Sequence, residues 1–339
     1  MATIKDIAKD TGFSITTVSR ALNGYSDVNE ETRSIIRASA KKLQYSPNML
    51  AQSLVTKKSK TIGLLVTDLK RESVKDNFVF EVLCGVGEYV ATIDYEMILI
   101  STTTSRQRNK TFSQVVGERN LDGVVIQGLK KDDPYLTEAV TSNLPTVLID
   151  IPIENSTTGF VTSDQEDSVK TAIKYLSRLG HQRIAFMNGH KHAYVSEIRF
   201  KAYQEALAEI GIDFDEKLLC YGDFEEEKAY QIALNFLLAT QDVSAIFCAS
   251  DIMALGVLQA ARELQIRIPQ ELSIIGFDNI LLTRYVSPSL STVAQNPFEL
   301  GKAAAQLVLE IINKTSSAHH LILQNELIVR ESSGPYLSK

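Results

Sequence analysis

From Thr61 onward the chain alternates short, apolar, β-rich runs with amphipathic helical stretches. The strand-like runs are TIGLLV, YEMILIS, LDGVVIQ, PTVLID, GFVTSD, QRIAFMNG, VSAIFCAS and LSIIGFD. Helical stretches such as SVKTAIKYLSRLG and RFKAYQEALAEIG lie between them. Apolar strands joined by helices are typical of buried parallel sheets with helices on both faces. The pattern therefore predicts a doubly wound α/β fold, and because it holds too many units for one ordinary sheet, we expect two lobes.

The charge of the chain is divided unevenly between its first 60 residues and the rest. Residues 1–60 hold ten Lys and Arg against five Asp and Glu, which gives a net charge of +5. Because the whole chain carries −6, residues 61–339 carry −11. A basic segment joined to an acidic one indicates that only the basic segment meets a polyanion such as DNA.

The first 45 residues carry the signals of three short helices that would form a small all-α head. Thr3 is a predicted N-cap with Asp6 in the first turn, and Gly12 ends that helix. Ser14 is the predicted cap of a second helix, ITTVSRALN, after only a tight turn, which is the spacing of a helix-turn-helix. Asn29 is the predicted cap of a third helix with an acidic first turn and a basic last turn, as the helix dipole favours.

The second of these helices has two different sides. Val18, Ala21 and Leu22 form an apolar stripe, so they should pack inward. The opposite side carries one methyl-rich, two hydroxyl and one guanidinium side chain, namely Ile15, Thr16, Ser19 and Arg20. Arg donates paired hydrogen bonds to guanine, and Thr and Ile meet phosphates or thymine methyls, so this set suits the major groove. The alternative is a surface helix without a partner.

The stretch YSPNMLAQSLVTKKSK, residues 45–60, follows the third helix. Ser46 and Pro47 form a helix-start signal at the N-cap and the first helical position. Only about two turns of helix follow before a basic run, and so short a helix is not stable alone in water. The stretch is therefore either a connector or a helix that something outside the chain completes.

TIKDIAKDTGFSITTVSRALN, VNEETR and YSPNMLAQSL, in this order and spacing, resemble the head of the lactose-repressor (LacI/GalR) family of transcriptional regulators. The resemblance continues in LDGVVIQG, LSRLGHQRIAFMNG, FCASDIMALGVLQAARE, IPQELSIIGFDN and ELIVRESS. It implies a DNA-binding repressor of sugar-utilisation genes rather than an enzyme. Such a protein binds a pseudo-palindromic operator as a homodimer and is controlled by a small-molecule effector, here expected to be a sugar or sugar phosphate. No cofactor is implied.

The resemblance also implies which residues meet DNA. Ile15, Thr16 and Arg20 match base-reading positions, and Ser14 and Ser19 match phosphate contacts. The implied DNA-binding set also includes Asn23, Ala51, Gln52 and Leu54.

In this family residues 46–60 would form a hinge helix on the operator, pair with the dimer mate and insert Leu54 into the minor groove. Gln52 stands where many relatives have Arg, so a charge that attracts phosphate is missing there.

The remaining residues, 61–339, would form an effector-binding and dimerisation core after a head at 1–45 and a hinge at 46–60. The resemblance implies the periplasmic-binding-protein-like architecture, which has two similar lobes and a ligand cleft between them. We expect the first lobe at about 61–160 and 291–321, and the second lobe at about 161–290 and 322–335.

Polar residues follow the predicted strands, where ligands of open α/β sheets bind. Asp150, Asp164, Asp251 and Asp278 end strands, and Arg199 is expected to begin a helix after the loop HKHAYVSEI. Carboxylates accept hydrogen bonds from neighbouring sugar hydroxyls, and an Arg donates two. The resemblance implies that Arg199 and Asp278 hold the effector, with Asp150 as a third contact.

Phenylalanines at matching positions would cover the apolar face of a sugar ring. They are Phe78, Phe224 and Phe298, and core packing is the alternative for each. Two departures affect the pocket. Ser250 also belongs to the implied effector set but stands where many sugar-responsive members have Asn, and the segment DLKRESVKD is longer than the usual connection.

Other interpretations concern catalysis, metals and effectors. Asp251 is expected to hold a strand-to-helix turn, although with Asp278 it could form a glycosidase-type carboxylate pair. His190 and His192 could bind a metal, but no third ligand stands at a telling spacing, so we expect a polar loop. A purine or a protein corepressor is the alternative to a sugar, since both occur in the family.

The remaining expectations concern location, thiols and assembly. The start MATIKDIAKDTG lacks a secretory signal and no apolar run reaches membrane-spanning length, so we expect a cytoplasmic protein. Cys84, Cys220 and Cys248 are expected to be reduced thiols because they are odd in number and widely spaced. No leucine-heptad tail follows ELIVRESSGPYLSK, which favours a dimer over a tetramer.

Overall fold

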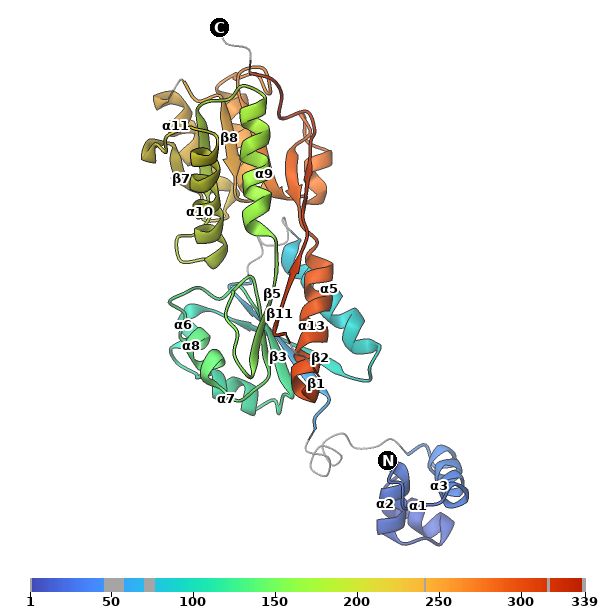
Figure 1. Cartoon of the computed structure of the whole chain (residues 1–339). Helices are drawn as coiled ribbons and strands as arrows, with labels where there is room; N and C mark the ends of the chain where they lie inside the picture. Colours follow the sequence, from blue (N-terminus) through green and yellow to red (C-terminus); the bar gives the residue numbers. More distant parts are fainter. Residues whose placement is uncertain (1, 46–57, 70–76, 241, 316–317, 337–339) are drawn as a thin grey trace. The chain divides into compact units, whose positions relative to one another are not determined.

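The computed structural model describes residues 2–45, 58–69, 77–240, 242–315 and 318–336. The chain divides into two compact units, Met1–Lys60 and Thr61–Lys339, and each has its own core. Figure 1 shows the helical unit in blue and the α/β unit in the remaining colours.

The helical unit consists of α1 (Ile4–Thr11), α2 (Ile15–Leu22) and α3 (Glu30–Lys42). Thr3 and Asp6 form a reciprocal capping box at α1, and Gly12 ends that helix with a φ of 75°. Ser14 caps α2, and Asn29 caps α3 through its side chain. The three predicted caps and the helix-turn-helix order are confirmed.

The core of the helical unit is small, so polar ties between its helices matter. Ile7, Val18 and Ile36 are fully buried, one from each helix. Asp10 of α1 accepts a hydrogen bond from Ser39 Oγ at 2.6 Å and pairs with Lys42 Nζ at 2.8 Å, both on α3. These contacts join the first and third helices and leave the second one to present its outer side.

The α/β unit contains two six-stranded sheets, which confirms the two predicted doubly wound lobes. The first sheet has the order β11-β5-β4-β3-β1-β2, with all neighbours parallel. Its strands are β1 (Thr61–Thr67), β2 (Glu96–Thr102), β3 (Gly123–Gln127), β4 (Thr146–Ile149), β5 (Thr158–Ser163) and β11 (His320–Leu323).

The second sheet has the order β12-β10-β9-β8-β6-β7, in which only β12 runs antiparallel to its neighbour. Its strands are β6 (Ile184–Asn188), β7 (Leu219–Tyr221), β8 (Ala245–Cys248), β9 (Ser273–Asp278), β10 (Ser291–Ala294) and β12 (Glu326–Ile328).

Helices cover both faces of each sheet (Figure 1). In the first lobe they are α5 (Phe78–Ala91), α6 (Thr104–Gln107), α7 (Phe112–Gly117), α8 (Pro134–Thr141) and α13 (Pro297–Asn313). In the second lobe they are α9 (Gln165–Arg178), α10 (Tyr194–Glu209), α11 (Glu226–Ala239) and α12 (Asp251–Glu263), with two short 3₁₀ turns, η2 (Glu216–Leu218) and η3 (Leu281–Arg284).

Strand alternation in β1 explains the two faces of the first sheet. Ile62 and Leu64 are buried in the cluster that includes α5 and α13. Leu65 belongs instead to the cluster formed with Phe112 of α7 and Tyr135 of α8. A strand buried on both faces reads as a continuous apolar run, which is why TIGLLV carries no polar residue in its middle.

Several expected boundaries differ in the structure. The sequence predicts a return to the first lobe at residue 291, but β10 pairs with β9 in the second sheet, so the chain returns only after Ala294. The other two predicted lobe boundaries fall inside β5 and β11, and both of these strands belong to the first sheet. Helix α10 begins at Tyr194, so Arg199 lies within the helix instead of beginning it. Val195 and Ile198 are β-branched, and such residues lower the helix propensity of a stretch. The start of α10 is therefore difficult to predict from the sequence.

A close helix crossing connects the two segments of the first lobe that are distant in sequence. A Cβ added at Gly85 of α5 would lie 2.0 Å from the carbonyl oxygen of Phe298 in α13. A Cβ added at Gly301 of α13 would lie 2.2 Å from the carbonyl oxygen of Val82. The two glycines therefore let the helix backbones touch. Among the described helices, none is both long and apolar enough to cross a membrane.

Candidate functional site

The outer side of α2 is accessible in the helical unit. Ile15 is 50% exposed although it is apolar, and Thr16 and Arg20 are also accessible. Val18 and Ala21 are fully buried, so the helix is oriented as its apolar stripe predicts. An exposed isoleucine beside a hydroxyl and a guanidinium is a surface suited to the edges of base pairs.

The polar residues at the ends of α2 already serve the helix. Ser14 Oγ accepts a hydrogen bond from the backbone N–H of Thr17 at 3.0 Å. Asn23 Nδ2 donates to the carbonyl oxygen of Ser19 at 2.9 Å. The other three members of the expected DNA-binding set, Ala51, Gln52 and Leu54, lie outside the described residues.

The α/β unit contains a cleft of about 850 Å³ between its lobes, at the carboxyl ends of the strands. From the first lobe it is lined by residues that follow β1, β3 and β4, namely Thr67 to Leu69, Gln127 to Lys130, and Ile149 to Ile151, with Val79. From the second lobe it is lined by His190, Ala193 to Val195, Asp223 to Glu227, and Ile252. The ligand site expected for two doubly wound lobes is therefore present as a cavity.

The cleft lining is strongly acidic. Its carboxylates are Asp68, Asp150, Asp223, Glu225, Glu226 and Glu227. The positive group among the described lining residues is Lys130, whose Nζ lies 3.0 Å from Asp68 Oδ2. Burial and the nearby Lys130 lower the pKa of His190, so this imidazole is neutral near pH 7. The surroundings therefore favour hydrogen-bond donors without negative charge.

Among the predicted polar effector residues, Asp150 lies on the cleft. Its Oδ1 accepts a hydrogen bond from Thr162 Oγ1 at 2.7 Å. Burial raises the pKa of Asp150, while the Thr162 hydrogen bond and the charge of Arg199 oppose that rise. The carboxyl group is held in place by β5 and can accept further hydrogen bonds, since each carboxylate oxygen has two acceptor positions.

Arg199 is buried and is not part of the cleft lining. It is only 3% exposed, its Nε donates to Gln165 Oε1 at 2.7 Å, and its guanidinium carbon lies 3.7 Å from the ring centroid of Phe277. It also donates to the carbonyl oxygen of Ala249. Burial lowers the pKa of Arg199, and the neighbouring carboxylates counteract this. The charge of Arg199 is thus balanced by the neighbouring carboxylates Asp278, Asp150 and Asp251.

Asp278 and Asp251 are not part of the described cleft lining either. Gln295 Nε2 donates to Asp278 Oδ1 at 2.5 Å. Asp251 accepts from Thr292 Oγ1 at 2.6 Å and from the backbone N–H of Ile280 at 2.9 Å. Burial raises the pKa of Asp251 well above its usual range, and the charge of Asp278 adds to this. Asp251 therefore fixes the turn after β9.

The three predicted phenylalanines have different places. Phe224 lines the cleft and its ring lies against Gly189, where an added Cβ would be 2.0 Å from Cζ. Phe78 packs on the core of the first lobe, and Phe298 lies at the α5–α13 crossing. Ser250 does not line the cleft either, because it caps α12 by accepting from Met253 N at 3.3 Å.

Sequence reasoning missed two polar residues at the strand ends. Thr67 ends β1 and Gln127 ends β3, and both line the cleft. Thr67 Oγ1 and Gln127 Oε1 are buried and have no hydrogen-bond partner among the described residues. Buried polar atoms are rarely left unpaired, so a ligand or water is expected at both. The polar residue that ends each apolar run was the available signal.

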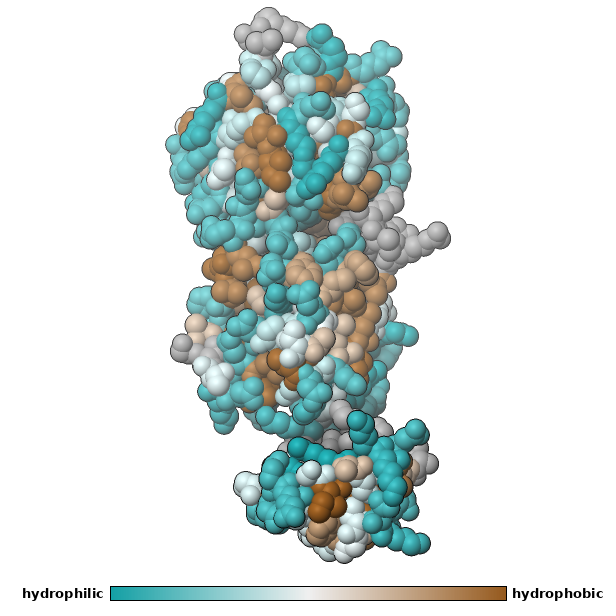
Figure 2. Space-filling view, turned by 90° about the vertical axis from the view of Figure 1, so that its right-hand side faces the viewer, coloured by the Kyte–Doolittle hydropathy of each residue, from teal (hydrophilic) through white to brown (hydrophobic). Residues whose placement is uncertain are grey.

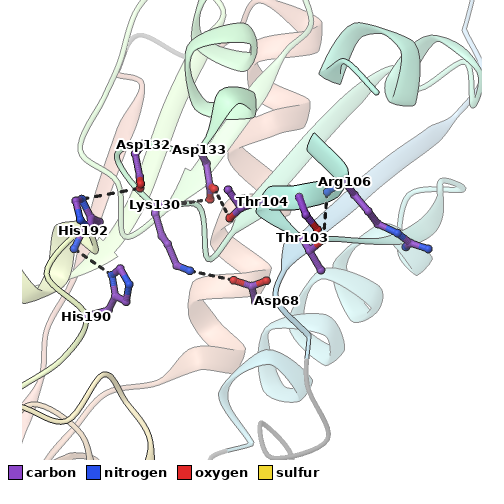
Figure 3. A network of polar contacts seen from close by, with 10 residues as sticks. Asp68, Thr103, Thr104, Arg106, Lys130, Asp132, Asp133, His190 and His192 are labelled. Carbon is purple, nitrogen blue, oxygen red and sulfur yellow. Dashed lines mark hydrogen bonds and ion pairs between the residues drawn. The ribbon is translucent and has the colours of Figure 1, made fainter. Parts of the chain in front are cut away.

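Figure 3 shows polar contacts near the cleft, in which Lys130 contacts Asp68 and Asp133, and His192 of the second lobe lies 4.0 Å from Asp132 of the first. Further contacts join the lobes next to these residues. The backbone N–H of Lys131 donates to the carbonyl oxygen of His192 at 3.0 Å, and the N–H of His192 donates to His190 Nδ1 at 3.1 Å. Lys131 also pairs with Glu197 across the lobes. In the part of the chain that the structure describes, no group of three or more potential ligands could hold a metal ion.

Comparisons with known proteins give two family matches. A family described as "Bacterial regulatory proteins, lacI family" matches residues 3–48. A family described as "Periplasmic binding protein-like domain" matches residues 173–333.

Relatives of similar length share sequence along nearly the whole chain. HTH-type transcriptional repressor PurR of Photobacterium profundum is 33% identical over 334 residues, which is 98% of this chain and 98% of that protein. PurR of Mannheimia succiniciproducens is 32% identical over 335 residues, with coverage of 98% of each chain.

Solved structures share the fold. A complex of the transcriptional regulator CelR with cellobiose has a TM-score of 0.74 and 26% identity, covering 98% of this chain and all of that one (100%). The lac repressor dimer bound to operator and the anti-inducer ONPF has a TM-score of 0.81 at 23% identity, covering 98% and 99% of the two chains.

Proposed function

We propose that this chain, which belongs to the lacI family of bacterial regulatory proteins and is a DNA-binding transcriptional repressor, is controlled by a neutral sugar in the cleft between its lobes. The observation that carries the proposal is the acidic lining of that cleft. Members of the family bind operator DNA as dimers, and we expect the same of this chain acting in the cytoplasm.

The cleft chemistry supports a neutral polyol. Sugar hydroxyls donate hydrogen bonds, and the carboxylates of Asp150, Asp223 and Glu227 are acceptors. Phe224 offers an apolar ring surface that suits the C–H face of a sugar ring. The unpaired oxygens of Thr67 and Gln127 offer two more acceptors in the first lobe.

A sugar phosphate fits the cleft less well than a neutral sugar. Its charge would meet the carboxylates that line the cleft, while Lys130 already pairs with Asp68. The positive end of the α11 dipole, which could attract phosphate, is occupied by Glu226 and Glu227 in the first turn. Repulsion between like charges at partly buried positions costs free energy, so a neutral sugar is favoured over a sugar phosphate as the effector.

Thermal unfolding of the full chain tests the effector class. A bound effector raises the unfolding temperature as its concentration exceeds its dissociation constant. Neutral mono- and disaccharides are expected to raise it, while their phosphates are not. Asp150→Asn should weaken the sugar-induced rise, and Asp213→Asn, the same change at an exposed position of the second lobe, should not. A rise caused by phosphorylated sugars alone would refute the neutral sugar.

A purine is the second candidate. The relatives that match nearly the whole chain at 32–33% identity are named PurR, and that name does not designate a sugar. Purine bases are neutral and carry N–H donors, so the acidic lining does not exclude them. Hypoxanthine, guanine and adenine therefore belong in the same thermal screen, and a response to them without a response to sugars would replace the first candidate.

For DNA we propose that α2 enters the major groove, with Ile15, Thr16 and Arg20 at base edges. The exposed side of α2 supports this, and Ser14 and Ser19 stand where phosphate contacts are expected. Footprinting on duplexes selected from a random library should reveal a protected pseudo-palindrome whose protection falls as salt rises. A complete lack of protected sites at low salt would contradict the proposal.

We further propose that exposed apolar residues of the α/β unit form the dimer interface. On α5 and β2 they are Phe80, Ile98 and Leu99, and in η3 and just after it they are Leu281, Leu282 and Tyr285. Figure 2 shows apolar residues gathered at the surface of both lobes. Apolar patches of this kind mark association surfaces.

Sedimentation of the full-length protein tests the interface. Tyr285 is 77% exposed, so Tyr285→Asp should cost little in the fold and yet shift the dimer toward monomer. Leu238→Asp is the matched control, because Leu238 is also apolar and 63% exposed but lies on α11. Equal effects of the two substitutions would argue against an interface at η3.

A further inference from the structure

Arg20 of α2 is held by two residues of the loop that follows its helix. Its Nε donates to Asp27 Oδ1 at 3.1 Å, and its Nη2 lies 2.5 Å from Asp27 Oδ2. Its guanidinium carbon also lies 5.1 Å from the ring centroid of Tyr25. One edge of the guanidinium therefore faces a carboxylate, and the group lies against an aromatic ring.

The loop that carries these two residues is itself fixed to the helical unit. Arg33 of α3 donates from Nη2 to the carbonyl oxygens of Tyr25 at 2.9 Å and Val28 at 3.2 Å. Val28 is buried in the core, and the backbone N–H of Tyr25 donates to the carbonyl oxygen of Arg20 at 3.1 Å. Gly24 permits the turn with a φ of 76°. Asp27 thus stands on a support that does not depend on the Arg20 side chain.

The geometry leaves a useful edge of Arg20 open. A guanidinium has five N–H groups, and a carboxylate that engages Nε and Nη2 leaves the edge between the two terminal nitrogens for another acceptor pair. Guanine offers such a pair in the major groove through O6 and N7. A long side chain that is already oriented loses less rotamer freedom when it binds.

We propose that Asp27 is a positioning residue that orients Arg20 toward one guanine of the operator and so sets selectivity at that base pair. The inference rests on the proposed base-reading role of Arg20. Asp27 is an exposed carboxylate and repels DNA phosphates, so it lowers affinity for DNA of any sequence. A residue that only stabilises the fold would not lower general affinity while raising selectivity at one position.

The test uses the full-length protein and duplexes selected from a randomised library. Competition binding then measures the discrimination against each single base-pair change. The variants are Arg20→Ala, Asp27→Asn and Asp27→Glu. The matched control is Glu31→Gln, which removes the same charge from an exposed position in the first turn of α3. Thermal unfolding of each variant checks that the helical unit is folded.

Arg20→Ala is expected to abolish discrimination at one base pair and thereby to identify it. At that base pair Asp27→Asn should lose about threefold to tenfold in discrimination, a part of what one paired arginine–guanine contact provides. Glu31→Gln should leave the discrimination at that base pair unchanged. Asp27→Glu should retain more of this discrimination than Asp27→Asn does. Both charge-removing variants should bind non-specific DNA more tightly.

Two results overturn the inference alone. In the first, Asp27→Asn and Glu31→Gln show the same discrimination at the base pair that Arg20 reads. In the second, Asp27→Asn sharpens discrimination there, which would mean that the carboxylate competes with guanine. A different result overturns the proposed role of Arg20 as well: Arg20→Ala would then change discrimination at no base pair, and Asp27 would have nothing to orient.

Discussion

The two units of this repressor each present an arginine next to carboxylates, but in opposite surroundings. Arg20 of the helical unit is exposed and pairs with Asp27, which is exposed as well. Arg199 of the α/β unit is buried, and its charge is balanced by Asp278 and Asp150. In water an ion pair forms and breaks at little cost, whereas in a protein interior the loss of one partner leaves an uncompensated charge.

The difference in exposure separates an arginine that is available for recognition from one that supports the fold. An exposed guanidinium that is held on one side can still exchange water for a base, which supports the base-reading role proposed for Arg20. A guanidinium enclosed by Gln165, Phe277 and Ala249 is committed to the protein. Arg199 therefore acts on the cleft through its charge, which opposes the rise in the pKa of Asp150.

The largest effect is expected when the buried arginine is removed. Arg199→Met should lower the free energy of unfolding of the α/β unit by about 3–5 kcal/mol, because the buried carboxylates lose their cation. Arg20→Met, the same substitution in the helical unit, should change stability by less than about 1 kcal/mol. Urea unfolding followed by circular dichroism measures both, and similar values for the two variants would remove the contrast between them.

For operator binding the order of the two arginines should reverse. Arg20→Ala is expected to weaken binding to the selected operator by about 1–3 kcal/mol, since it removes paired hydrogen bonds to a base. Arg37→Ala changes another exposed arginine of the same unit. It should weaken binding to DNA of every sequence by a similar amount, and by less than Arg20→Ala weakens binding to the operator. Fluorescence anisotropy at several salt concentrations separates the two effects. Loss of affinity without loss of selectivity in Arg20→Ala would make it a phosphate contact.

The hinge extends the comparison to a segment outside the described residues. Leu54→Ala is expected to weaken operator binding by about 1–3 kcal/mol, the order of the unstacking and contact contributions at one base step. Binding to non-specific DNA should not change, because insertion requires the operator. Val55→Ala serves as the control within the same stretch. An operator affinity that equals that of the unchanged protein would make residues 46–60 a simple linker.

The smallest effect concerns the pH dependence of stability at Asp150. Burial raises the pKa of Asp150 in the fold, so the folded state binds this proton more tightly than the unfolded chain does. Below the unfolded pKa of about 3.9 both states are protonated, and stability falls as the pH rises from there through the raised pKa. Asp150→Asn should remove this fall, whereas Asp213→Asn should not. Urea unfolding from about pH 4 to about pH 7 tests it.

Much of the helical unit was predictable because its signals are local. Thr3, Ser14 and Asn29 are caps by virtue of side chains that reach backbone groups three residues away. The exposed position of Arg20 follows from the spacing of Val18 and Ala21. Its pairing with Asp27 was not predicted, because that contact depends on the path of a loop held by Arg33.

The cleft was predictable only in outline. Asp150 follows β4 and Phe224 follows β7, and both line the cleft, while their contact with an effector stays a prediction. Ser250 and Phe298 match family positions but serve a helix cap and a helix crossing in this structure. Position in sequence gives the end of the sheet at which a residue lies, and it does not give the direction of the side chain.

Residue spacing along the chain is enough to predict the two units, the three helix caps, the order of strands along the chain and the family. These features depend on short-range spacing and on the alternation of apolar residues. Three features became visible only in the folded chain: β10 joins the second sheet, Arg199 is buried away from the cleft lining, and Thr67 and Gln127 line the cleft. The physical reason is that these positions depend on packing between segments distant in the chain.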